Sequence, residues 1–554
     1  MARISTKNPI LAPPQVPDPI QLLSEVRVDG GMNTRIDAAD IPQNQLVLAR
    51  NVYVDADKLI RFDGTILLTP PKPATDLLDL ENGDQLLQED TFDILLDQGN
   101  TEPINVLYTF QRFNGTTVFL RFTDNKVWRR LSNSWLEVTS ATPYTLPTGG
   151  RVRLLPFNDR LFFVSGTNNI YEIDFTANTY AYLGNAGKYK YITGFFNRIV
   201  GANKYDTSTP NPTLVAWSGD LNFAQWDANV DISAGSTPLL EAASDFADPI
   251  SGLFGFASVM LILRERSLWT AQKRPVASNP FLFQAAYPFV GCDTPNSAVQ
   301  KRNGIIWYDY RSNQVYDYTL GDRPREVGEA VRDNIKPKIT NKENPIGSYN
   351  PITNEYILTI PGTNTTVTYA YVLNLNNGAW TERTIENCTC IYAFDDTSAA
   401  LLIDELSGTI DELSGTINDL ANLTTSPPTL YYGMSQGDIL IASPVDTDNG
   451  ASIETILQSK IFKLYDRYIS ITRIRFTYIP LRAGEFTVQY NNGNGWTTYK
   501  TVTFDLNAVG VRSRVACTKQ VRAREFQWRI TSLAGNFATL DYSIDITPAS
   551  FGKI

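Results

Sequence analysis

The chain of 554 residues contains no histidine. An imidazole is the general base of Ser-His-Asp and Cys-His nucleophilic centres, and it supplies most ligands of zinc and non-haem iron sites. These kinds of site are therefore excluded. A phosphate loop is also missing, because the segment 184–188 lacks the required spacing and the Ser or Thr after its lysine. We predict no catalytic, cofactor-binding or metal-ligating residue, expect no cofactor, and expect that the protein is not an enzyme.

Cysteine is scarce, with only Cys292, Cys388, Cys390 and Cys517 in the chain. Two of them are two residues apart and the others are distant, so their spacing indicates neither a disulfide framework nor a four-ligand zinc site. We expect buried free thiols at all of these positions.

Long hydrophobic runs are missing as well. The nearest candidate, residues 253–263, ends at Arg264 and is shorter than the roughly 18 residues that a membrane-spanning helix needs. The N-terminal residues lack the apolar core of a secretory signal, so we expect neither a membrane span nor export by that route. Residues 1–27 are rich in proline, which predicts an extended N-terminal arm.

Short strands rich in aromatic and β-branched residues are abundant. Residues 151–226 contain two copies of one pattern, in which an apolar strand, a tight turn and a second apolar strand precede an aromatic strand. The tight turns fall at 157–159 and 196–198, and similar turns occur at 113–115, near Gly255, at 303–304 and at 353–354. Such strands, separated by Asn, Asp and Gly, predict antiparallel meander sheets.

The spacing of these turns, roughly 40 to 60 residues, is the period of a four-stranded propeller blade. We therefore predict an all-β protein with a β-propeller over residues 28–450. Further copies at Ala49–Leu68 and Tyr431–Ser443 bring the prediction to about six to eight blades.

Two repeats are inserted into this predicted propeller. The acidic repeat at about 75–100 has no basic residue, and it is either a solvated hairpin or a rim or lumen segment that repels DNA. The heptad-like repeat at about 400–428 contains Ile and Leu at a seven-residue period from Ile403 to Leu420. Its glycines each cost a helix about 1 kcal/mol, so we expect stacked single turns in place of one long helix.

Residues 451–554 have longer alternating strands and are predicted to form a separate C-terminal β-sandwich. From residue 452 onward there are 14 basic and 7 acidic residues, net +7, whereas the rest of the chain has 34 and 51, net −17. The basic side chains expected on adjacent strands are Arg512, Arg514, Lys519, Arg522, Arg524 and Arg529. Their face is either merely solvated, or it contacts a neighbouring copy or DNA, and charge alone does not choose.

One ordered set of motifs resembles a known family. The set begins with a Gly-Gly-Met-Asn-Thr-Arg segment at 30–35, an Ala-Arg-Asn-Val strand at 49–52 and a Leu-x-Arg-x-x-Gly hairpin at 59–64, and it continues at 262–270, 293–297, 302–310 and 372–385. Across residues 28–390 this order resembles the tail hub or nozzle proteins of short-tailed bacteriophages (podoviruses), which are β-propeller proteins.

The resemblance implies a structural virion protein of the phage tail, assembled in the host cytoplasm. It implies a homohexameric ring below the portal adaptor ring, with tail fibres or a needle-like plug as further candidate contacts. Viral double-stranded DNA would pass through the ring during ejection without specific binding. Two alternatives stay open: a receptor- or carbohydrate-binding propeller at the tail tip, and a glycan-degrading propeller enzyme with a spatial pair of carboxylates.

Overall fold

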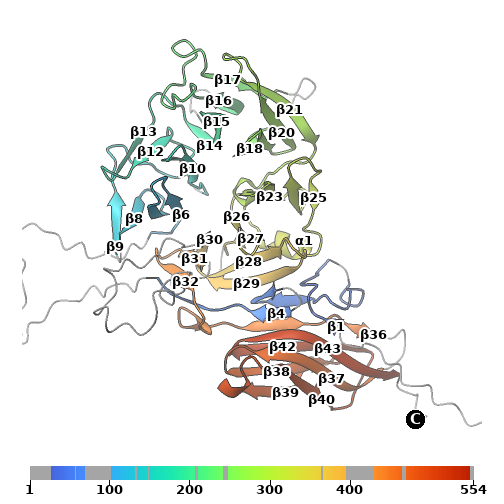
Figure 1. Ribbon diagram of the computed structural model, residues 1–554. Coiled ribbons are helices and arrows are strands. Elements are labelled where there is room, and N and C mark those ends of the chain that lie inside the picture. The colour runs from blue at the N-terminus through green and yellow to red at the C-terminus, as the bar shows by residue number, and fades with distance from the viewer. Residues whose placement is uncertain are drawn as a thin grey trace, which may run out of the picture.

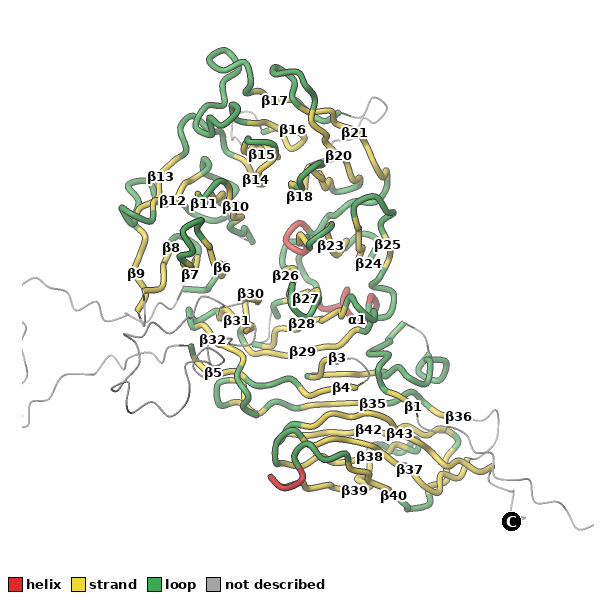
Figure 2. Tube along the Cα trace, viewed as in Figure 1, coloured by secondary structure: helices red, strands yellow, loops and turns green. Residues whose placement is uncertain are grey.

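Nearly all regular structure is β-strand. The computed structural model describes residues 26–35, 37–55, 58–68, 102–131, 134–147, 149–205, 210–240, 248–362, 366–394, 429–463 and 469–548. Within these ranges the helical elements are α1 (Arg332–Ile335) and the 3-10 turns η1 (Pro295–Ser297), η2 (Lys336–Lys338) and η5 (Leu506–Ala508) (Figure 2). The predicted all-β class is therefore confirmed. The acidic repeat at 75–100, the heptad-like repeat at 400–428 and the arm up to residue 25 lie outside the described residues.

Four-stranded antiparallel sheets stand in a ring and form a β-propeller (Figure 1). In the first six sectors the strands pair in sequence order, and the first strand of each lies nearest the axis. The sectors are β6 (Val106–Gln111), β7 (Thr117–Phe122), β8 (Val127–Leu131) and β9 (Ser134–Val138); β10 (Arg153–Phe157), β11 (Arg160–Val164), β12 (Tyr171–Asp174) and β13 (Thr179–Tyr182); β14 (Tyr189–Phe195), β15 (Arg198–Lys204), β16 (Asn211–Trp217) and β17 (Gly235–Pro238); β18 (Ile250–Gly255), β19 (Val259–Arg264), β20 (Ser267–Lys273) and β21 (Phe281–Pro288); β22 (Val299–Lys301), β23 (Gly304–Asp309), β24 (Gln314–Thr319) and β25 (Arg325–Glu326); β26 (Ile346–Asn350), β27 (Glu355–Ile360), β28 (Val367–Asn374) and β29 (Trp380–Glu386).

A seventh sector closes the ring with a strand from the N-terminal part of the chain. It consists of β30 (Cys388–Phe394), β31 (Thr429–Met434), β32 (Ile439–Ala442) and β5 (Thr65–Leu67), and two short strands, β33 (Thr447–Asp448) and β34 (Ala451–Ser452), extend it. Strand β5 pairs antiparallel with β32, so residues far apart in the sequence complete one sheet. On the other side, the inner strand β30 contacts β6 of the first sector. The number of sectors falls within the predicted range of about six to eight.

The predicted tight turns are present. Asn158 and Asp159 have φ of 56° and 60°, and the flanking Phe157 and Arg160 are register partners in β10 and β11. Phe196 and Asn197 likewise have positive φ between β14 and β15. Two successive residues in the left-handed region are the geometry of a two-residue hairpin loop, which matches the twist of its strands.

The C-terminal strands form a sandwich of two sheets. One sheet contains β1 (Val26–Arg27), β3 (Val52–Asp55), β4 (Lys58–Arg61), β37 (Ile469–Pro480), β40 (Ser513–Cys517), β41 (Val521–Ala523) and β43 (Phe537–Pro548). The other contains β2 (Leu48–Arg50), β35 (Thr455–Gln458), β36 (Phe462–Lys463), β38 (Gly484–Asn491), β39 (Trp496–Phe504) and β42 (Glu525–Ala534). Trp528 packs between the sheets, with ring centroids 4.9 Å from both Phe476 and Tyr542.

Two expectations about the ends of the propeller are wrong. The segment Ala49–Leu68 is not a blade of its own, because the β3–β4 hairpin pairs with β43 of the sandwich and only β5 enters the ring. The sandwich is also not separate from the propeller. Strand β2 pairs in parallel with β29 and antiparallel with β35, so the sheet of the sixth sector continues into the sandwich (Figure 1).

Candidate functional site

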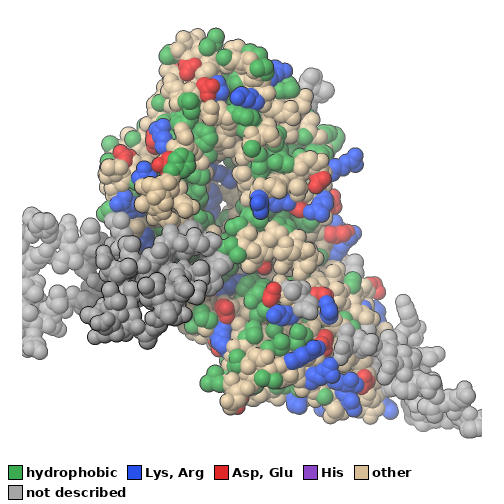
Figure 3. Space-filling model, in the orientation of Figure 1, with side chains coloured by type: hydrophobic (Ala, Val, Ile, Leu, Met, Phe, Trp, Pro, Cys, Tyr) green, Lys and Arg blue, Asp and Glu red, His purple; other side chains and the backbone are tan. Residues whose placement is uncertain are grey.

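The seven inner strands of the propeller surround an axial cavity of about 720 Å³. Its lining comes from β6, β10, β14, β18, β22, β26 and β30, so every sector contributes to it. We call this space the axial cavity. In the space-filling view the centre of the ring is hollowed, and Lys or Arg side chains are visible inside the hollow (Figure 3). This is the place where all parts of the propeller converge.

Glycine lets neighbouring inner strands approach closely around the axial cavity. A Cβ atom on Gly255 of β18 would lie 2.2 Å from the carbonyl oxygen of Gly194 on β14. A Cβ atom on Gly347 of β26 would lie 2.0 Å from the carbonyl oxygen of Ser297. Any side chain at either position would force the sectors apart, so these glycines set the width of the cavity.

The charge of the lining has one sign. Among the described lining residues, Arg151 and Arg153 are the charged side chains, and none is Asp or Glu. The other polar or aromatic members are Asn105, Tyr108, Phe157, Tyr191, Thr193, Phe254, Asn296, Gln300, Ser348, Tyr349 and Tyr392. The cavity therefore presents a positive potential together with amide, hydroxyl and ring surfaces.

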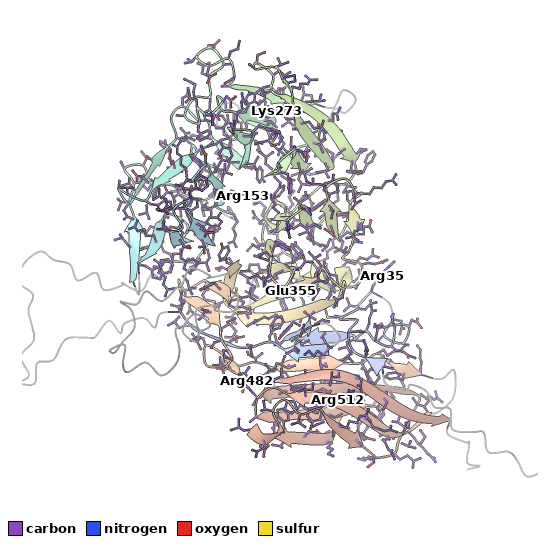
Figure 4. All side chains as sticks on the ribbon, viewed as in Figure 1. Arg35, Arg153, Lys273, Glu355, Arg482 and Arg512 are labelled. Atoms are coloured by element: carbon purple, nitrogen blue, oxygen red, sulfur yellow. The ribbon has the colours of Figure 1, made fainter. Side chains whose placement is uncertain are left out.

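Arg153 reaches from the second sector to the fifth. Its Nη2 donates hydrogen bonds of 2.9 Å to the carbonyl oxygen of Pro295 and 2.8 Å to Oδ1 of Asn296. The guanidinium carbon lies 5.0 Å from the ring centroid of Tyr191, which places the cation over an aromatic face. Burial lowers the pKa of the Arg153 guanidinium. Figure 4 shows Arg153 beside the central opening of the ring.

Arg151 ties the second sector to the seventh. Its Nη2 donates a 2.9 Å hydrogen bond to the carbonyl oxygen of Thr389, and its Nη1 donates to the carbonyl oxygen of Asn105. Arg151 also lines a second cavity of about 450 Å³ that contains Asp124. Burial lowers the pKa of Arg151 and the nearby Asp124 carboxylate opposes this effect. Together Arg151 and Arg153 bridge sectors on different sides of the axis.

A second group of charged residues lies where the propeller meets the sandwich. The carboxylate of Glu382 on β29 is fully buried, and it accepts hydrogen bonds of 2.8 Å from Nε of Arg50 and 2.7 Å from Nζ of Lys338. Burial alone would raise the pKa of Glu382, but the charges and hydrogen bonds of Lys338 and Arg50 outweigh it and lower the pKa. In this internal ion-pair network both carboxylate oxygens of Glu382 have a cationic partner, which is typical of a structural joint.

Arg61 anchors the same joint from β4. Its side chain is only 1% exposed, and it donates to the carbonyl oxygens of Ile453 at 2.9 Å and Leu533 at 3.2 Å, and to that of Gly535. Asp446 lies 3.4 Å from Nη1 and supplies the negative charge. Arg61 therefore holds β4, the end of β42 and the chain leading into β35 together.

Among the residues that the structure describes, no group of three or more Cys, Asp and Glu side chains is placed to hold a metal ion, and no helix is long and apolar enough to cross a membrane. The four cysteines are free and buried, as predicted from their spacing.

The predicted basic face of the sandwich is present in part. Arg514 lies on β40 and Arg522 on β41, both of which pair with β37. Arg529 lies on β42 in the other sheet, where its guanidinium carbon is 4.3 Å from the ring centroid of Trp496. Lys and Arg side chains gather over the sandwich in Figure 3.

Arg151 and Arg153 were not singled out from the sequence. Arg153 begins β10 and Arg151 lies two residues before it, so the Arg-Val-Arg spacing in an extended segment predicts that both side chains share one face. The spacing does not reveal that the lining contains no carboxylate. That property depends on inner strands of other sectors, some of them nearly 200 residues away in the sequence.

No protein-family model and no curated protein matches the chain. Similar solved structures include a quinoprotein alcohol dehydrogenase-like protein from Bacteroides thetaiotaomicron, with 11% identity, 55% of this chain and 68% of that chain covered, and a TM-score of 0.29. Another is the extracellular domain of a putative hybrid two-component system from the same organism, with 9% identity, coverage of 77% and 57%, and a TM-score of 0.35. A third is a glycoside hydrolase family 43 arabinoxylan arabinofuranohydrolase from Bacillus subtilis, with 9% identity, coverage of 81% and 96%, and a TM-score of 0.22. At such TM-scores these likenesses carry no argument about this chain.

Proposed function

We propose that the protein is a structural virion protein of a short-tailed phage, and that copies of it form the tail nozzle or hub ring through which DNA is ejected. The observation that carries the proposal is how the motifs of the family resemblance meet in the fold. One pair of these motifs lies far apart in the sequence and another lies close together, and in both pairs the motifs pack against one another as structural joints.

The first pair joins the Gly-Gly-Met-Asn-Thr-Arg segment to the 372–385 segment. The backbone N–H of Met32 donates a 2.7 Å hydrogen bond to the carbonyl oxygen of Trp380. Gly31 has φ of 67°, and a Cβ atom there would lie 2.7 Å from the backbone nitrogen of Trp380. This motif is therefore fitted to the sixth sector by backbone contact.

The second pair joins the 293–297 segment to the strand at 302–310. Oδ1 of Asp293 accepts a 2.8 Å hydrogen bond from the backbone N–H of Tyr310, and Oγ of Ser297 accepts a 3.0 Å hydrogen bond from that of Tyr308. Ser297 in turn donates to the carbonyl oxygen of Tyr308 at 2.9 Å. Asp293 and Ser297 of this motif therefore hold the fifth sector together.

The axis of a single propeller is too small for duplex DNA. A duplex is roughly 20 Å across, so a 720 Å³ space bridged by Arg151 and Arg153 could not pass it. The conduit in this proposal therefore lies between copies of the chain, whose antiparallel sheets would form a stiff wall. A net charge of −10 would oppose tight contact between that wall and DNA phosphates.

The test is the oligomeric state of the purified full chain, measured by light scattering after size-exclusion chromatography, alone and with tail extract fractions that contain the portal adaptor. The proposal expects a hexamer in at least one of these samples. A chain that stays monomeric in all of them, and that binds surface glycans on an array, would instead favour the receptor-binding alternative.

A further inference from the structure

Arg153 has no acidic side chain as an ion-pair partner among the described residues. Among the described residues it forms no ion pair, and both of its hydrogen bonds to them are donated by Nη2. The N–H groups of Nε and Nη1 have no partner within the same residues. Two other arginines that are half-buried or buried have a carboxylate partner: Arg50 pairs with Glu382, and Arg61 with Asp446. Arg153 is different from these structural arginines.

A half-buried guanidinium without a counter-ion is costly. Removing a charge from water carries a penalty that an opposite charge or a full set of hydrogen bonds normally offsets. The lowered pKa of Arg153 reflects this penalty. Arg151 has Asp124 nearby as a compensating charge, on the side of the second cavity. The uncompensated charge of the axial cavity is therefore that of Arg153.

The side chain of Arg153 is held in place from two sides. Asn296, which accepts from Arg153, is itself fixed by a 2.6 Å hydrogen bond from its Nδ2 to the carbonyl oxygen of Glu343. The Tyr191 ring supports the guanidinium from its face. A donor that is already oriented loses little conformational entropy when it binds a ligand, which favours affinity.

The rest of the axial cavity suits a small ring compound. Its volume of about 720 Å³ lies within the range of ligand pockets, roughly 300 to 1,000 Å³. Tyr108 and Tyr392 lie side by side in the lining with ring centroids 6.1 Å apart, and Gln300 and Ser348 add polar groups. Gln300 is exposed, so the cavity communicates with solvent at its position.

From this geometry we propose that the axial cavity binds a small organic anion, a carboxylate or phosphate carried on a ring of monosaccharide size, through Arg153. The oxyanion accepts a charge-assisted hydrogen bond from one of the N–H groups that Arg153 has free, on Nε or on Nη1, and the ring packs against tyrosine faces of the lining. The site belongs to one copy of the chain and does not depend on ring assembly. It goes beyond the proposed structural role, which assigns no ligand.

The experiment is isothermal titration calorimetry on the full chain at low ionic strength. The probes are glucuronate for a carboxylate, glucose 6-phosphate for a phosphate, glucose as the neutral ring, and inorganic phosphate as the anion without a ring. We expect saturable binding of glucuronate or glucose 6-phosphate at one site per chain. We also expect glucose to bind at least tenfold more weakly, because it lacks the charge-assisted hydrogen bonds to Arg153.

Three variants identify the site. Arg153→Gln should weaken binding of the ring anion by about tenfold or more. Gln300→Glu should also weaken it, because a carboxylate in the lining opposes the ligand while the contacts of Arg153 to Pro295 and Asn296 stay in place. Arg160→Gln removes a cation of the same sector that pairs with Glu172 outside the cavity lining, and it should leave binding unchanged.

Circular dichroism and a thermal melt show whether each variant is folded. If Arg153→Gln does not fold, the proposal is tested by comparing the affinity of Gln300→Glu for the ring anion with that of Arg160→Gln. The proposal is overturned if the folded wild-type chain binds none of the ring anions at concentrations up to about 10 mM. It is equally overturned if inorganic phosphate binds as tightly as the ring anions, which marks an adventitious ion only, or if Gln300→Glu binds as the wild type does.

Discussion

Arg50 and Glu382 join the two halves of the molecule. Nε of Arg50 on β2 donates a 2.8 Å hydrogen bond to Oε1 of Glu382 on β29, and the same two residues are partners in the parallel register of these strands. The sixth sector of the propeller and the sandwich sheet are continuous at this point. A fully buried carboxylate thus stands at the joint, with Lys338 as its second cation.

Replacing this carboxylate should destabilise the whole chain. Glu382→Gln leaves the charges of Arg50 and Lys338 without a buried anion, and we expect the free energy of unfolding to fall by about 3 kcal/mol. A urea titration followed by tryptophan fluorescence measures it. Glu386→Gln is the matched control, since Glu386 ends the same strand and is exposed. Equal effects of the two substitutions would contradict the role given to Glu382.

The same carboxylate predicts a pH dependence. Because its pKa in the folded protein is lowered from the ordinary value of 4.5, Glu382 contributes stability above pH 4.5, and the contribution is lost as the pH falls through the folded value. The difference in unfolding free energy between wild type and Glu382→Gln should therefore shrink on acidification below pH 4.5.

Glu355 should show the opposite pH dependence of stability, because its pKa is shifted in the opposite direction. Burial raises the pKa of Glu355, although the hydroxyl of Thr353 partly opposes this. Its contribution to stability is therefore present below its ordinary value of 4.5 and is lost as the pH rises through the raised value. Glu355→Gln should gain stability relative to wild type as the pH rises above 4.5. If the stability of Glu382→Gln and that of Glu355→Gln, each relative to wild type, changed in the same direction with pH, the opposite pKa shifts given to the two residues would be contradicted.

Gly31 should tolerate no side chain. Gly31→Ala places a Cβ atom 2.7 Å from the backbone of Trp380 at a positive φ, and we expect a loss of about 3 kcal/mol. Gly115→Ala is the control, because φ is also positive there but nothing lies within 4 Å of the added atom. We expect it to cost about 1 kcal/mol, from backbone strain alone. Thermal melts of both variants measure the difference, and equal losses would argue against the contact.

The thiols should be inert in the folded protein. All four cysteines are buried, and burial raises the pKa of Cys517 to about 11. Since the thiolate is the reactive form, a disulfide reagent such as Ellman's should titrate fewer than one thiol per folded chain at pH 8, and four after denaturation. Rapid reaction of a thiol in the folded chain would show that a propeller sector or the sandwich opens.

Local patterns predicted the hairpins but not the partners of their outer strands. The Asn158–Asp159 turn is encoded by residues that adopt positive φ, so β10 and β11 are recognisable from a few neighbouring positions. The β3–β4 hairpin has the same alternation, and nothing local distinguishes pairing with β43 from a place in the ring. The choice depends on Arg61 and its carbonyl acceptors near residues 453 and 533–535, which are far away in the sequence.

The candidate site was less predictable still. The absence of histidine excludes imidazole chemistry at the level of residue types, but the sequence around an arginine does not show whether its side chain will have an ion-pair partner. Arg153 meets Asn296 and Tyr191 because three sectors converge on one axis. The ring that brings these sectors together is closed by β5, through a pairing between residues 65–67 and 440–442.

The most direct test of the central claim is a cryo-electron microscopy reconstruction of the assembled tail during DNA ejection. The account predicts copies of this chain around a shared lumen of roughly 20 Å or more, with duplex density in that lumen and none along the axis of any single propeller. A reconstruction in which the chain stands apart from the DNA path, for example as a single propeller at the tip of a fibre, would contradict it.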